Sequence, residues 1–474
     1  MLHFMLAGCL LILAVIPAIA GKGELEATAK DQQQVSVTIY NQDLALVRDQ
    51  RRVVIPEGRQ VLAFKDVSAR IQPETVLFSA KDCRVLEQNF EYDLLTPASL
   101  LQKYVGREVA IVRTHPTTGE DQEVPARVLS AAKGQVVLES AGHIETGIPG
   151  RLIFPDVPET LRARPTLTML LESRSGSDRE VELSYLTGGL SWQADYVAEL
   201  ADDEASLELN GWVSLNNESG VSYRNARLQL VAGDVHRVRR EMRTDLRMKK
   251  VMLAAKAEGD MREETMFEYH LYTLERPTTI ADRQRKQVAL LQASGVRCRK
   301  EYVLRGAEYY YSQPFSGSGD KKKVAVYLNL DNTRDDGLGM PLPAGTMRVY
   351  KKDLSGSLQF VGEDRIDHTP ENETIQLRLG NAFDVTATRK QTDFKKLAGF
   401  SAYNYVFESA FTIVLKNARR EPVQVRVIEP IPGDWQMITE SASHSKETSD
   451  TATWIIGVPA KGETSLSYRV QVRY

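Results

Sequence analysis

The sequence predicts a mainly β protein in which several β-sandwich or small-barrel modules follow one another along the chain. Three observations predict this class. Apolar and polar residues alternate over many short segments, as expected for strands with one buried face. Turn-forming Gly, Pro and Asn separate these segments. Long helical periodicity is almost absent, which favours sandwich architecture.

Composition places the chain among ordinary folded proteins. Apolar residues make up 42% and charged residues 26% of the sequence, so a sizeable core can form. At ~100–200 residues per domain, a chain of 474 residues suggests two to four domains. The net charge of −3 is too small to indicate a nucleic-acid partner or an anionic membrane surface.

Residues 1–20 have the pattern of a secretory signal peptide. They contain no charged residue, carry an apolar run over residues 6–16 and end in Ala18-Ile-Ala20, which predicts cleavage before Gly21. Retention as an anchor is the alternative, although the run is shorter than the ~20 apolar residues of a membrane span. No later segment is long and apolar enough to cross a membrane. We therefore expect a periplasmic or extracellular protein.

The cysteines bear on two questions, lipidation and disulfide formation. Cys9 lies in a segment that resembles a lipoprotein box, but its lipidation would leave a leader of only eight residues. Cleavage after residue 20 would leave Cys83 and Cys298, too few for a disulfide scaffold. Export permits one bridge between them; two separate buried thiols are the favoured reading.

An N-terminal β domain is expected over residues 30–160. Residues 44–47 and 51–55 are interpreted as two paired strands of a meander. A short helix is expected near residues 97–104, because Thr96 can cap it and Pro97 suits its first turn. Closely spaced short strands then predict a small barrel-like module over about residues 107–155.

Residues 166–474 are expected to form further β-sandwiches, with an Ig-like C-terminal sandwich from about residue 386. Residues 411–415 and 423–427 are interpreted as a hairpin across a polar turn. Residues 237–265 break the strand pattern: basic residues come first and acidic residues follow. A basic arm that grips phosphate or lipid is one interpretation, but a solvated, mobile connection fits the neighbouring opposite charges better.

Residues 181–236 are the most characteristic part of the chain. In them Trp192, Asp195, Asn216 and Asp234 look like the components of a site. Strand alternation instead places Trp192 on a core face and the segment after Asn216 in a turn. This stretch, with residues 267–288, 341–350 and 362–370, resembles the bacterial DUF4139 family, a domain of unknown function. The resemblance covers roughly residues 166–474 and implies no activity.

Candidate chemistry is weak throughout, and no catalytic, cofactor-binding or metal-binding residue and no cofactor is predicted. Asp234 and His236 could bind a metal, but a polar strand end is favoured. Residues 331–337 resemble a calcium loop without its oxygen spacing, so a polar turn is favoured. His270 and Tyr272 could act as acid and base, or be buried hydrogen-bond partners in a sheet. Residues 309–311, three consecutive tyrosines, suit either a carbohydrate-stacking platform or aromatic side chains on a sandwich strand.

Two functions are compatible with the sequence. The favoured one is a non-catalytic binding or structural protein of the cell envelope, whose partner is a protein or an envelope polymer. The alternative is an extracytoplasmic hydrolase acting on glycans or peptides, with a site assembled from distant loops. The sequence identifies neither the ligand nor the oligomeric state.

Overall fold

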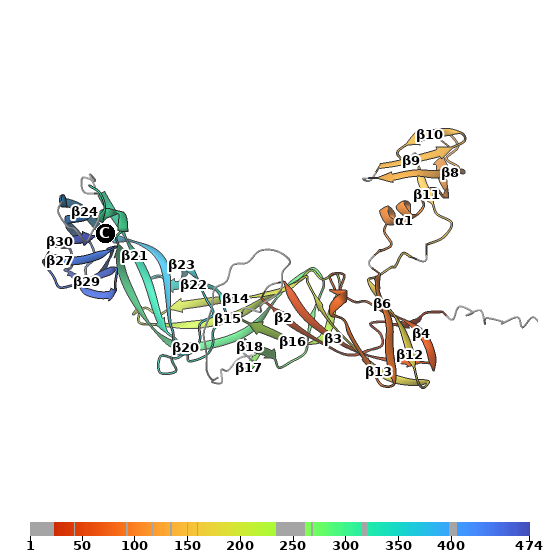
Figure 1. Ribbon diagram of the computed structural model, residues 1–474, viewed down its shortest axis with the longest axis horizontal. Coiled ribbons are helices and arrows are strands. Elements are labelled where there is room, and N and C mark those ends of the chain that lie inside the picture. The colour runs from red at the N-terminus through yellow and green to blue at the C-terminus, as the bar shows by residue number, and fades with distance from the viewer. Residues whose placement is uncertain are drawn as a thin grey trace, which may run out of the picture.

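The computed structural model describes an elongated chain of β-structure (Figure 1). The residues described are 23–474, except 42, 92, 116, 133–134, 149, 159, 234–260, 267–268, 315–319 and 398–404. Within them lie thirty strands, one α-helix and two short 3-10 helices, so the predicted mainly β class is confirmed. No helix among these residues has the length and apolarity needed to span a membrane. The predicted leader and residues 237–260 of the charged connection lie outside the described residues.

The N-terminal third contributes to two sheets. A four-stranded sheet has the order β1 (Leu25–Ala27), β4 (Gly58–Lys65), β12 (Thr166–Ser173) and β6 (Cys83–Glu91). An eight-stranded sheet has the order β17 (Met261–Met266), β18 (Tyr269–Leu274), β16 (Tyr223–Ala232), β2 (Gln32–Tyr40), β3 (Leu44–Ile55), β13 (Ser177–Thr187) and β5 (Leu77–Ala80), with β19 (Thr278–Ile280) also paired to β16. A 3-10 helix, Pro73–Thr75, precedes β5.

Strand β3 corrects one expectation. Residues 44–47 and 51–55 are not paired strands but parts of one strand, which pairs with β13 along its whole length. The polar residues between them are accommodated because each has a partner. Arg48 binds Glu182 on β13 at 2.9 Å, and Arg51 forms a buried ion pair with Asp49 at 2.7 Å. A polar run that looks like a turn is therefore stabilised as a strand.

A small module stands apart from the rest of the chain (Figure 1). Its five strands have the order β10 (His143–Thr146), β9 (Gln135–Ser140), β8 (Asp121–Ala132), β7 (Glu108–Thr114) and β11 (Arg151–Ile153). Helix α1 (Pro97–Lys103) lies where a helix was predicted, and the side chains of Thr96 and Ser99 form a reciprocal capping box at its start. The module has a hydrophobic core of its own, which includes Tyr104, Ile111 and Leu138.

The remaining strands form one thirteen-stranded sheet that passes through two sandwiches. Its main path is β23 (Leu358–Ile366), β22 (Gly345–Lys352), β14 (Leu190–Leu200), β15 (Ser206–Asn217), β20 (Gln284–Arg305), β21 (Asp320–Asp331), β24 (Thr374–Leu397), β25 (Val406–Asn417), β30 (Glu463–Arg473) and β27 (Asp434–Glu440). Branching from it are β26 (Val423–Pro430), β29 (Thr451–Val458) and β28 (Ser445–Thr448). Strands β20 and β24 are long enough to belong to both sandwiches.

The two sandwiches repeat one path of the chain. We call β14–β16, β2, β18, β19 and the first half of β20 the middle sandwich, and β25–β30 with the second half of β24 the C-terminal sandwich. In each, an antiparallel hairpin (β14–β15 or β24–β25) leads to a strand that pairs in parallel with an earlier one: β16 with β2, and β26 with β20. A later strand, β20 or β30, then returns beside the second strand of the hairpin.

A buried asparagine stabilises the crossing between layers in both sandwiches. Asn217 ends β15 and Asn417 ends β25. Each side-chain amide donates to three backbone carbonyls: Val221, Ile280 and Ala281 in one sandwich, and Glu421, Val458 and Pro459 in the other. The predicted hairpin of residues 411–415 and 423–427 is therefore wrong. The intervening polar segment crosses from β25, which pairs with β24 and β30, to β26, which pairs with β20 and β29.

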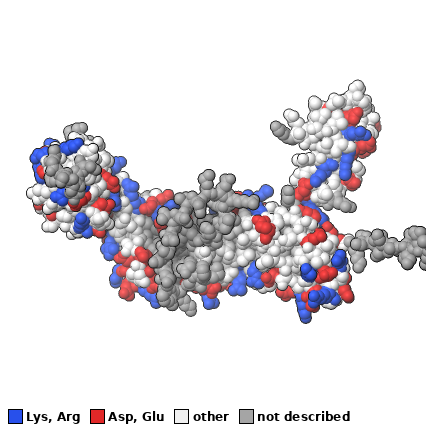
Figure 2. Space-filling view, in the orientation of Figure 1, with Lys and Arg blue, Asp and Glu red and all other residues white. Residues whose placement is uncertain are grey.

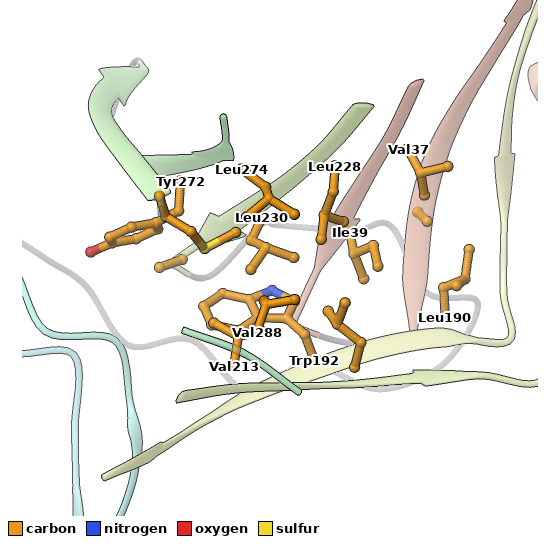
Figure 3. Close-up of a cluster of buried hydrophobic side chains, with 14 of the residues drawn as sticks. Val37, Ile39, Leu190, Trp192, Val213, Leu228, Leu230, Tyr272, Leu274 and Val288 are labelled. Carbon is orange, nitrogen blue, oxygen red and sulfur yellow. The ribbon is translucent and has the colours of Figure 1, made fainter. Parts of the chain in front are cut away.

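The core confirms the faces predicted by strand alternation. Trp192 is buried with Leu190, as expected, and packs among side chains of β2, β16 and β18 (Figure 3). The tight turn before β14 depends on Gly189, which has a φ of +81°. A Cβ at this position would lie 2.7 Å from the Cα of Ser219, so the turn accepts no larger residue without rearrangement.

Candidate functional site

The strongest candidate site lies where the strands of the C-terminal sandwich end. Strand β20 leads there into a 3-10 helix, Glu308–Tyr311. The residues singled out as 309–311 are therefore helical, and the expected run of aromatic side chains on a strand is wrong. Tyr310 and Tyr311 are buried, whereas Tyr309 is 50% exposed. One short turn thus anchors two rings in the core and presents the third at the surface.

The anchor is a buried network of charged and aromatic groups. The Tyr311 hydroxyl donates to Glu429 at 2.8 Å and lies 2.9 Å from the Tyr468 hydroxyl. Glu429 forms an ion pair with Arg389, whose guanidinium lies 4.5 Å from the centre of the Tyr310 ring. Burial raises the pKa of Tyr311 well above its usual value. All members of the network are enclosed, so its role is to fix the helical turn.

Gly306 allows the helical turn to lie directly over this network. A Cβ at that position would overlap the Glu429 carboxylate. The amide of Gly306 also donates to the carbonyl oxygen of Ile428 at 2.8 Å, which continues the pairing of β20 with β26. The backbone that positions Tyr309 is therefore held from both sides.

The rings of Tyr309 and Tyr474 border a hollow of about 650 Å³, which we call the aromatic hollow. Its lining consists of Ala307, Glu308, Tyr309, Ser312, Pro430, Pro432 and Tyr474. Tyr474 is 36% exposed. Burial, reinforced by the nearby carboxylate of Glu308, raises the pKa of its hydroxyl. Flat aromatic and proline surfaces therefore alternate with a few polar groups, as in many ligand sites.

Further aromatic rings continue from the hollow across the sheet. Tyr474 contacts Phe407 edge to face at 5.9 Å. The rings of Tyr405 and Phe407 are nearly parallel, with centres 6.2 Å apart, and Phe394 lies 5.6 Å beyond Phe407. Tyr405 is 51% exposed, and the Lys396 ammonium lies 4.6 Å from its ring centre. The aromatic surface is thus larger than the hollow itself.

Other residues singled out from the sequence have structural partners. His270 lies 2.7 Å from Glu263, and the Tyr272 hydroxyl donates to the Pro341 carbonyl at 3.1 Å, so each has a hydrogen-bond partner of its own. The side chain of Asn332, in the turn resembling a calcium loop, is hydrogen-bonded to Met340, Pro370 and Gly339 backbone groups. Asp234 and His236 lie outside the described residues. No group of three or more potential metal ligands gathers among the described residues.

Asp195, on β14, is a buried carboxylate of the middle sandwich. It accepts a hydrogen bond from Ser214 at 2.6 Å and forms an ion pair with Arg348 at 3.1 Å. Burial raises the pKa of Asp195, but these hydrogen bonds outweigh it and the net shift is downward. Asp195 is therefore a stable acceptor in this sandwich.

Several carboxylate pairs are bridged by an arginine. Arg162 binds Glu24 and Glu91, Arg348 binds Asp195 and Glu363, and Arg469 binds Asp393 and Glu408. A general acid needs a carboxyl group that stays protonated near neutral pH. A bridging guanidinium stabilises the ionised form instead. Charges of both signs are also intermingled over the visible surface (Figure 2).

The two cysteines among the described residues, Cys83 and Cys298, occupy different sheets and are free thiols. Cys83 begins β6 of the four-stranded sheet, where it accepts a hydrogen bond from Arg179 at 3.0 Å. Cys298 is buried in β20, and burial together with nearby carboxylates raises its pKa to about 11. The thiols are separate, as expected, but of the two only Cys298 is buried and Cys83 is partly exposed.

Comparison with known proteins identifies one relationship. Residues 181–474 match the model of a family described as "Domain of unknown function (DUF4139)". This is the family that the sequence motifs resemble. No curated protein matches the chain in sequence. The relationship supplies no site, so the function must be argued from the geometry.

Proposed function

Because the chain belongs to the DUF4139 family, whose description assigns no activity, we propose its function from the surface it presents. We propose an exported, non-catalytic binding protein of the cell envelope that holds its partner at the aromatic hollow. The observation that carries this proposal is the exposure of Tyr309, Tyr405 and Tyr474 beside one rigid turn. Large aromatic side chains that remain exposed are typical of recognition surfaces.

Export is argued from residues 1–20, whose uncharged apolar run and Ala18-Ile-Ala20 end fit a cleaved leader. Fractionation of cells that produce the protein, with sequencing of its mature N-terminus, tests this part. A mature chain that begins at Gly21 in the periplasm or medium is the expected result. A cytoplasmic chain that retains residues 1–20 contradicts it.

Binding is preferred to the alternative of a hydrolase because of the carboxylates. Hydrogen bonds from arginine lower the pKa values of Glu24 and Asp393, and hydrogen bonds from Ser214 and then Arg348 lower that of Asp195, so these groups suit ion pairing better than proton donation. Among the described residues that line the aromatic hollow, Glu308 supplies the one carboxylate side chain. Glycoside hydrolysis normally uses two carboxylates that flank the scissile bond.

A sedimentation assay tests the binding proposal. Purified protein is mixed with isolated cell-wall and membrane fractions, and the bound share is measured after centrifugation. A Tyr309→Ala/Tyr474→Ala variant should bind more than about tenfold more weakly, as for loss of interface anchors. The matched control is Phe360→Ala, because Phe360 is 57% exposed on β23, away from the hollow. Equal binding by both variants, or release of soluble fragments from the cell wall by the wild type, would contradict the proposal.

A further inference from the structure

We propose that the aromatic hollow binds a neutral glycan chain, a ligand assignment that rests on the binding function proposed above. The first support is the shape of the lining. Tyr309 and Tyr474 provide aromatic faces, and Pro430 and Pro432 provide flat aliphatic ones. A pyranose ring presents C–H groups on its faces and hydroxyls at its edge. The hollow offers the complementary arrangement of apolar faces and peripheral polar groups.

The second support is the charge of the hollow. Glu308 is the only charged member of the described residues that line it. Within the described part of the chain, no hydrogen bond or ion pair engages its carboxylate. A free carboxylate accepts strong hydrogen bonds, and two sugar hydroxyls can share its oxygens. It repels phosphate, sulfate and uronate groups, so charge complementarity favours an uncharged glycan over an anionic polymer.

The third support comes from the repeated path of the two sandwiches. Ser206 opposes Arg297 in the middle sandwich as Val406 opposes Arg473 in the C-terminal one. This register aligns Leu207 with Phe407, and Cys298 with Tyr474. Leu207 and Cys298 are buried, because the hydrophobic core continues past them into β21 and β24.

The C-terminal copy lacks that continuation among the described residues. At the aligned positions Phe407 is half-buried and Tyr474 remains partly exposed. The C-terminal sandwich therefore has larger aromatic residues where the middle sandwich has smaller, buried ones. This difference leaves aromatic ring surface accessible at the strand ends of the C-terminal sandwich.

The fourth support is rigidity. Tyr309 cannot move without its neighbours, because Tyr310 and Tyr311 are locked into the core by the network of Arg389 and Glu429. Affinity for a flexible sugar chain depends on limiting the entropy lost on binding. A preformed aromatic surface loses little, so the helical turn provides the preorganisation that a weakly interacting ligand needs.

Titration of the mature chain with defined oligomers tests the assignment. The probes are chitohexaose and cellohexaose as neutral glycans, hexagalacturonate as an anionic glycan and decaproline as a peptide. Isothermal calorimetry should detect at least one neutral glycan and no hexagalacturonate. Tyr309→Ala and Tyr474→Ala should each weaken that binding about tenfold, and Glu308→Gln should weaken it less while the anionic probe gains affinity. Phe360→Ala should leave every affinity unchanged.

The outcomes separate this inference from the function on which it rests. Decaproline binding that is lost in Tyr309→Ala, without glycan binding, overturns the glycan and identifies a peptide groove, since aromatic grooves also bind proline-rich segments. Sedimentation with envelope fractions that survives glycan digestion but not protease overturns the glycan while the binding function stands. Binding of hexagalacturonate as tightly as a neutral oligomer overturns the charge argument. Thermal unfolding checks that each variant is folded.

Discussion

The buried pair of Arg389 and Glu429 makes a quantitative prediction about the C-terminal sandwich. Both side chains are essentially inaccessible to water. Replacement Arg389→Met leaves the Glu429 carboxylate buried without its cation, which should cost about 3–5 kcal/mol in the free energy of unfolding. The Tyr311 hydroxyl cannot compensate, because its hydrogen bond to the carboxylate is already present in the wild type and one bond to a charged group contributes only about 1.5–3 kcal/mol. Urea unfolding followed by tryptophan fluorescence reports the change, since Trp435 and Trp454 belong to the same core.

Two further variants make this prediction refutable. In the double variant Arg389→Met/Glu429→Leu neither charge of this pair remains buried. Most of the lost stability should therefore return, to within about 1–2 kcal/mol of wild type. Arg48→Met is the matched surface control. The Arg48 side chain is 53% exposed in its ion pair with Glu182. Arg48→Met should therefore lower the free energy of unfolding by less than about 1 kcal/mol. A loss below about 1 kcal/mol for Arg389→Met alone, or a double variant as unstable as the sum of its single variants, would refute the reasoning.

Three other predictions concern the rest of the chain. Burial raises the pKa of Glu204, but hydrogen bonds from Lys300 and Lys351 outweigh it and lower the value to about 2. Because the folded pKa is depressed, Glu204 stabilises the fold above pH ~4.5 and this contribution disappears as pH falls towards ~2. Glu204→Gln should therefore lower the free energy of unfolding, measured with urea at pH 7, by roughly 1–2 kcal/mol after screening. It should have little effect at pH 2. Iodoacetamide at pH 8, mapped by mass spectrometry, should label Cys83 and spare Cys298, whose pKa is about 11; equal labelling contradicts the burial of Cys298. Residues 93–162 expressed alone should fold, because a bridge between Leu94 and Arg162 closes their base around a separate core; absence of a cooperative thermal transition by circular dichroism contradicts this.

Strand faces could be predicted from the sequence because alternation is a local property. The spacing of Leu207, Leu209 and Val213 in the sequence predicts one shared face, and all three are buried. Helix α1 could be predicted for the same reason, since Thr96 and Pro97 act within one turn. These features need no knowledge of which strands are neighbours.

Pairing partners could not be predicted in the same way. The polar residues from Arg48 to Gln50 look like a turn, but the neighbouring strands β2 and β13, with Glu182 of β13, stabilise them as a strand. The segment after Asn417 also looks like a hairpin turn. The side chain of Asn417 donates to the carbonyls of Val458, which ends β29, and of Pro459, about forty residues further along. Both errors have one cause: the deciding contact is distant in sequence.

The aromatic hollow shows the same limit at the level of a site. Tyr474 has the same strand parity as Val470 and Val472, which are buried, so alternation assigns all three to the core. The position of a residue in the alternating pattern of a strand fixes the face to which its side chain points. It does not fix whether a second layer of the sandwich covers that side chain. In the middle sandwich the core extends past Cys298 and covers it, whereas at Tyr474 the ring remains partly open. Exposure of an inward-pointing aromatic residue therefore depends on how far the two layers overlap, and the candidate site lies where that overlap ends.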